Sequence, residues 1–138
     1  MIAKEKIQQA VMNEIADNWA TTAVDYPGVG FDVNAQDEWI QPTVIRNAPH
    51  PSRKARDDTR IHLDINVFVR QGTNSNAHRV QELADGVAVL FDQVEVDLLD
   101  SSATIRFGEV EFTELGVVVR NDDKLQQINL AVIGSVIH

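Results

Sequence analysis

The sequence RIHLDINVFV at residues 60–69 decides the fold. Its polar residues alternate with apolar ones, which are Ile61, Leu63, Ile65, Val67 and Val69. A period of two predicts a β-strand with one buried face, because successive side chains point to opposite faces. After the turn at residues 70–76 the apolar residues recur at steps of three and four, at Val80, Leu83, Ala84, Val87, Leu90 and Phe91. This spacing predicts a helix with one apolar stripe, which can pack on the strand and start a core.

The preceding part of the chain predicts a helix over residues 2–21, where Ile7, Val11, Ile15 and Trp19 form an apolar stripe. Residues 24–33 contain one proline and two glycines, so we expect an irregular crossing anchored by Tyr26 and Phe31. Residues 38–47 predict a strand. Pro42 cannot donate a hydrogen bond, so this strand should lie at an edge or contain a bulge there.

The following part predicts strands at residues 94–99, 103–107, 109–113, 115–120 and 126–137, with a turn at 121–124. The last strand has apolar residues on both faces, which indicates a central strand or one covered by a neighbouring subunit. Residues 1–138 therefore predict a single α+β domain. Its sheet should be mostly antiparallel (mixed), with about five to six strands, two principal helices packed on it and a long basic β-hairpin loop.

The composition is that of an ordinary globular domain, with 43% hydrophobic residues and 24% charged residues. No apolar run reaches the roughly 18 residues of a membrane span, so we expect no membrane contact. The absence of cysteine excludes disulfides and thiolate metal sites. The formal net charge of −9 makes the chain a poor general binder of nucleic acid.

The charge is uneven, because five of the 12 basic residues lie within residues 46–60. They are Arg46, Arg53, Lys54, Arg56 and Arg60. Against Asp57 and Asp58 they give this segment a local charge of +3. Two interpretations stay open: an arm that contacts DNA phosphates or an acidic partner surface, or a solvated hairpin tip.

No catalytic pattern is present, so we predict a protein that is not an enzyme and has no catalytic residue, cofactor or metal. His62 and Asp64 share one strand face, but a catalytic zinc requires three protein ligands. The pair Glu109 and Glu111 suits a two-metal nuclease or a glycosidase, or an acidic strand edge that limits aggregation. The glycines of residues 28–30 match neither phosphate-binding motif.

Six short motifs occur in an order that resembles one protein family. They are Trp19-Ala20-Thr21-Thr22, Asp25-Tyr26-Pro27-Gly28-Val29-Gly30-Phe31, Glu38-Trp39-Ile40-Gln41-Pro42, Ile65-Asn66-Val67-Phe68-Val69-Arg70-Gln71-Gly72-Thr73, Val80-Gln81-Glu82-Leu83-Ala84-Asp85 and Val89-Leu90-Phe91. The chain is similar to the lambda-like minor tail proteins, the tail terminators of long-tailed bacteriophages. The similarity covers about residues 15–135.

The resemblance implies a structural role in the virion, at the tail–head junction, after assembly in the host cytoplasm. It implies a homo-oligomer, a hexameric ring that stops tail-tube polymerisation and contacts the tube protein and a head-completion (stopper) protein. DNA would pass through the ring without sequence-specific binding. Candidate inter-subunit contacts are Gly72, Thr73 and Asn74, and the basic loop is a candidate partner-facing or DNA-facing surface. The alternatives are another head–tail connector, such as a stopper or tail completion protein, and a small metal-dependent enzyme using His62 and Asp64.

Overall fold

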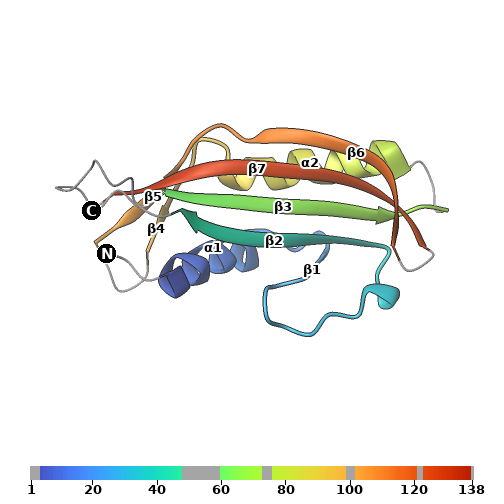
Figure 1. Ribbon diagram of the computed structural model, residues 1–138, viewed down its shortest axis with the longest axis horizontal. Helices are drawn as coiled ribbons and strands as arrows, with labels where there is room; N and C mark the ends of the chain where they lie inside the picture. The colour runs from blue at the N-terminus through green and yellow to red at the C-terminus, as the bar shows by residue number, and fades with distance from the viewer. Residues whose placement is uncertain (1–3, 48–59, 73–75, 99–101, 121–122, 138) are drawn as a thin grey trace.

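The computed structural model consists of a strongly curled sheet with both helices on one of its faces (Figure 1). It describes residues 4–47, 60–72, 76–98, 102–120 and 123–137. The elements in chain order are α1 (Lys4–Asn18), β1 (Ala23–Val24), the 3-10 helix η1 (Val33–Ala35), β2 (Glu38–Asn47), β3 (Arg60–Arg70), α2 (Asn76–Phe91), β4 (Glu95–Asp97), β5 (Thr104–Phe107), β6 (Glu111–Arg120) and β7 (Asp123–Ile137).

Strand β7 is the centre of the sheet, as its two apolar faces predicted. One edge of β7 pairs with β3, and the other pairs with β6 along its first part and with β5 near its end. The strand order is β1-β2-β3-β7-β5-β4, with β6 paired to β7 off this path. All pairs are antiparallel except β1 with β2, so the predicted α+β class with a mostly antiparallel, mixed sheet is confirmed.

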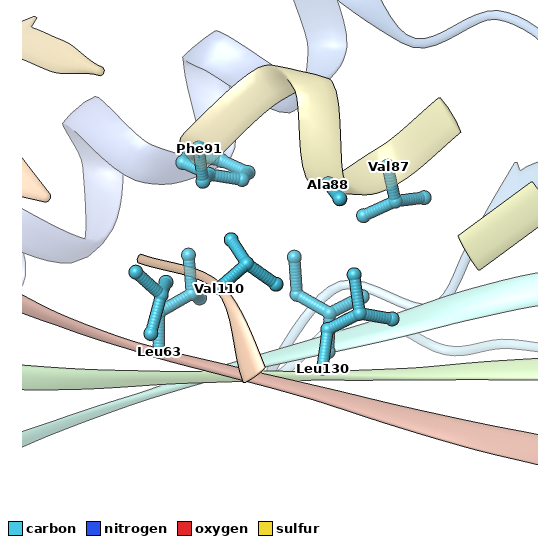
Figure 2. A pocket seen from close by; sticks show the side chains of 8 residues that line it. Leu63, Val87, Ala88, Phe91, Val110 and Leu130 are labelled. Atoms are coloured by element: carbon cyan, nitrogen blue, oxygen red, sulfur yellow. The ribbon is translucent and has the colours of Figure 1, made fainter. Parts of the chain in front are cut away.

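The core lies between the helices and the facing side of the sheet. The residues predicted to alternate inward on β3 are all buried there. Figure 2 shows Val87, Ala88 and Phe91 of α2 above Leu63 and Leu130, with Val110 closing the side. The free volume between them is about 10 Å³, which at most admits a single water, so this region is packed core and has no room for a ligand.

Several predicted boundaries are wrong. The last strand begins at Asp123, three residues before the predicted start, so Asp123 and Lys124 pair with β6 instead of forming the predicted turn. The first helix ends at Asn18, three residues before the predicted end. Trp19 leaves the helix to pack on Gly86 of α2, where a β-carbon would lie 3.1 Å from the indole ring. The segments predicted as strands 109–113 and 115–120 form one strand, β6, because a bulge at residue 115 keeps both halves paired with β7.

Pro42 lies where no other described strand pairs with the outer edge of β2, so its predicted place at an edge is confirmed for the described residues. Strand β1 covers β2 only at Trp39 and Ile40, and the Asp25 amide donates to the Ile40 carbonyl. Main-chain groups two residues apart point to the same edge, so the Pro42 nitrogen also faces outward. The missing N–H group therefore costs the sheet no hydrogen bond.

Candidate assembly surface

Strand β6 is paired along one edge only in the described part of the chain. Its ten residues pair with β7 from Glu111 opposite Ala131 to Arg120 opposite Asp123. Along its other edge the main-chain N–H and C=O groups have no neighbouring strand among the described residues. Such an edge is a template for pairing with another strand.

The same strand exposes four apolar side chains. Their exposed fractions are 44% for Phe112, 47% for Leu115, 49% for Val117 and 66% for Val119. Helix α2 packs mainly on β3 and β7, and these side chains of β6 stay exposed. Val117 and Val119 are neighbours on one face of the strand, and exposed apolar groups gathered on a folded domain mark a surface that binds other proteins or membranes.

A bulge divides β6 into two halves. The pairing register shifts between Glu114 and Gly116, so Leu115 is the extra residue. Gly116 has a φ of +67°. This lies in the left-handed region, which residues with a β-carbon rarely adopt. The bulge also moves the alternation by one residue, so Phe112, Val117 and Val119 all belong to the face that carries the helices.

A hollow lies beside the bulge, between β6 and the start of α2. Its free volume is about 80 Å³, and Val80 and Gln81 of α2 line it together with Glu114 and Gly116 of β6. It is wide enough to receive a side chain from a bound partner.

Acidic groups surround this strand. Glu111 and Glu114 are exposed on β6, and Glu82 and Asp85 are exposed on α2. Basic groups lie at the end of the strand: Lys124 is exposed on β7 opposite Val119, and the Arg120 guanidinium lies 4.9 Å from the centre of the Phe68 ring. The surface is thus apolar in its middle, acidic at the start of the strand and basic at its end.

An aromatic cluster fixes the end of the sheet beneath Arg120, on the face opposite the helices. The Trp39 and Phe68 rings stack with centroids 5.1 Å apart, and Phe31 packs against Trp39 at 6.3 Å. Arg70 lies 5.9 Å above Trp39, and its side chain reaches the Val33 carbonyl at 2.8 Å and Asp123 at 2.7 Å. Arg70 therefore holds η1 and the start of β7 against the aromatic pair.

A second hollow of about 110 Å³ lies beside this cluster. Its lining combines Trp39 and Leu125 with the side chains of Asp25, Gln41 and Arg120. The Asp25 carboxylate is already bonded to the Gln41 amide at 3.1 Å. The lining has a mixed charge and selects no ligand class.

Part of the predicted basic loop lies outside the described residues. Arg53, Lys54 and Arg56 are not described, and for Arg46 only the backbone at the end of β2 is described. Arg60 begins β3 and is exposed. The two interpretations of the loop stay predictions.

The predicted turn contacts are described at one position. Gly72 is exposed with a φ of +109°, and Thr73 and Asn74 lie outside the described residues. His62 Nε2 lies 3.3 Å from Asp64 Oδ1, close enough for attraction when the imidazole is protonated, but the angles make no hydrogen bond. The described residues contain no group of three or more potential metal ligands.

The sequence reasoning missed the exposure of β6. It treated residues 115–120 as an ordinary strand, although it did consider an acidic edge for Glu109 and Glu111. The missed signal was Val117-Val118-Val119. Three consecutive apolar residues place apolar side chains on both faces of the strand, although the same strand also contains Glu111 and Glu114. Within the described segments, no helix has the length and apolar content needed to cross a membrane.

Comparisons with known proteins show the fold and no family. No protein-family model matches the sequence, and no curated protein matches it. Eight chains of solved structures match the fold. One of them, known only by a sequence identifier, aligns with a TM-score of 0.74 over 100% of this chain and 98% of its own length. Its sequence is 15% identical, so the likeness extends to the architecture alone.

Proposed function

We propose that this protein is a tail terminator subunit of a long-tailed bacteriophage. In this role, copies form a ring at the head-proximal end of the tail tube, end tube polymerisation and join the tail to the head connector. The observation that carries the proposal is strand β6, whose apolar side chains are exposed and whose second edge pairs with no other strand in the described segments. A chain with such a surface has other protein subunits as its natural partners.

The charge of the surface favours protein partners with a basic rim. Glu111 and Glu114 lie at the start of the strand beside Phe112 and Leu115, and opposite charges across an interface steer association and fix its orientation. The order of sequence motifs adds to this proposal, because Trp39, Phe68 and Phe91 occupy motif positions and are buried. These motif residues build the scaffold, and β6 supplies the contact surface.

The test is electron microscopy of phage particles that lack the protein. Overlong tails without heads are the expected result, because an unterminated tube continues to polymerise. Tails of normal length without heads would refute the terminator role and identify a stopper or tail completion protein instead.

A variant test separates the surface from the fold. Val117→Ser removes an apolar group from β6, and Val89→Ser removes an equally small apolar group from the solvent side of α2, where Val89 is 74% exposed. We expect the Val117 variant to lose tube capping and the Val89 variant to retain it. If neither variant alters capping, β6 is not the contact surface.

The enzyme alternative has its own measurement. Calorimetric titration with Mg²⁺, Mn²⁺ or Zn²⁺ tests whether His62 and Asp64 take part in a metal site. Tight binding that His62→Ala abolishes would favour the alternative over the structural role.

A further inference from the structure

We propose that the free protein covers β6 with the β6 strand of a second copy. The two strands run antiparallel about a two-fold axis that passes between Leu115 and Gly116. The proposal goes beyond the tail role and does not depend on it, because it concerns the protein before any other partner is bound.

The bulge makes this self-pairing geometrically consistent. In a continuous sheet, residues that face each other across two strands must lie on the same sheet face. Glu111 and Arg120 are nine residues apart, so in a regular strand they would lie on opposite faces. The extra residue Leu115 corrects this, since Glu111 and Arg120 pair with Ala131 and Asp123, which share one face of β7.

In this register the two residues of every other facing pair also lie on the same face of the sheet. Residues 111–114 of one copy face residues 120–117 of the second copy, and the symmetry repeats the contact. The bulge falls on the axis, between the two paired halves, so neither half is interrupted. No residue of β6 is proline, so every residue whose main chain faces the open edge can supply a donor.

Side-chain chemistry favours this register. Glu111 of one copy faces Arg120 of the second copy, so the acidic start of each strand meets the basic end of the other. Phe112 faces Val119 of the second copy, and both side chains are exposed in the single chain. Cross-strand pairs of opposite charge, and of aromatic with β-branched residues, are those that stabilise antiparallel sheets.

The predicted dimer is weak and reversible. The contact involves eight residues of each copy along one strand edge. A contact of that extent buries much less surface than a permanent interface. It nevertheless shields an edge that would otherwise pair without control. In the tail, other partners would displace the second copy from β6. A dimer that is permanently cross-linked through β6 should therefore fail to cap tail tubes.

Charge exchange with analytical ultracentrifugation tests the register. Glu111→Arg and Arg120→Glu each bring like charges together twice per dimer, so each should weaken dimerisation by about tenfold or more. The variant with both changes restores opposite charges and should recover the dimer. Glu5→Arg on α1 is the control for Glu111→Arg, because it makes the same change of net charge at an exposed residue far from β6 in the sequence.

A single cysteine tests the axis. The chain contains no cysteine, so Leu115→Cys introduces the only thiol, next to the two-fold axis. Oxidation should give a disulfide-linked dimer rapidly, whereas Val89→Cys on α2 should cross-link slowly at the same concentration. A chain that stays monomeric up to millimolar concentration, a double charge variant that fails to recover, or equal cross-linking of both thiols would overturn the proposal. If the dimer behaves as expected but the protein never caps tail tubes, the dimer proposal stands and the proposed tail role is refuted.

Discussion

Gly134 allows Ile105 and Phe107 to approach β7 closely, and replacing it with alanine should expose that constraint. Gly134 lies on β7 opposite Phe107 of β5 and is buried. A β-carbon there would lie 2.8 Å from Ile105 Cγ2 and 3.0 Å from two atoms of the Phe107 ring. Real β-carbons essentially never lie closer than 3.0 Å to another atom, so Ile105 or the strand that carries Gly134 must move, and the Phe107 ring is tightly crowded as well.

The magnitude follows from two opposing effects. Replacing glycine with alanine restricts the unfolded chain and stabilises a compatible site by about 0.4–1 kcal/mol. Overpacking a rigid core costs about 1–3 kcal/mol. We expect Gly134→Ala to lower the free energy of unfolding by about 1–2 kcal/mol.

Gly30→Ala is the matched control. Gly30 has no atom within 4 Å of its added β-carbon and no positive φ, so only the effect on the unfolded chain operates there. Urea denaturation should separate the two variants by about 2 kcal/mol with unchanged m-values. If Gly134→Ala proved as stable as Gly30→Ala, the packing assigned to β5 and β7 would be incorrect. Phe107→Leu should relieve part of the cost of Gly134→Ala in a double-mutant cycle.

Three further changes test contacts that hold the elements together. Glu38→Gln should cost about 1 kcal/mol at pH 7, because the Glu38 carboxylate binds Arg79 at 2.6 and 2.9 Å and the pair is partly exposed. The hydrogen bond to Arg79 lowers the Glu38 pKa below its ordinary 4.5. The stabilisation is therefore complete above pH 4.5 and is lost as the pH falls through the lowered pKa. The free energies of unfolding of the variant and the parent in urea should converge at that low pH. Arg70→Ala should cost about 2 kcal/mol in urea unfolding and alter the near-ultraviolet circular dichroism of Trp39, and Arg70→Lys should recover little because lysine lacks the planar fork. Leu130→Ala should cost about 3 kcal/mol by calorimetry, because it enlarges a core space that is otherwise filled.

Elements whose burial follows a simple period could be predicted from the sequence. In β3, every second residue packs against the helices on one face of the sheet, so the burial pattern can be read directly from the sequence. The stripe of α2 behaves in the same way. The end of α1 could not be predicted, because Trp19 leaves the helix to reach Gly86, a partner 67 residues further along the chain.

The candidate surface depended on distant elements, and for that reason it was missed. Phe68 stands among the polar residues of β3, yet it is fully buried because Trp39 stacks on it from β2. In contrast, Val117 and Val119 are apolar and exposed because α2 lies over β3 and β7. Exposure of this kind depends on where a helix is placed, and local periodicity contains no information on that placement.

Pro42 has a consequence for how many copies the sheet can join. The outer edge of β2 lacks a donor at its centre, and the edge strand β4 is only three residues long. Among the described strands, pairing strand to strand is therefore practicable at β6 alone, because short or proline-containing edges resist such addition. A sheet with two open edges can add copies without limit and grow into a fibril. A sheet with one open edge stops at two copies, so the stoichiometry of edge pairing is already limited by a single proline and one short strand.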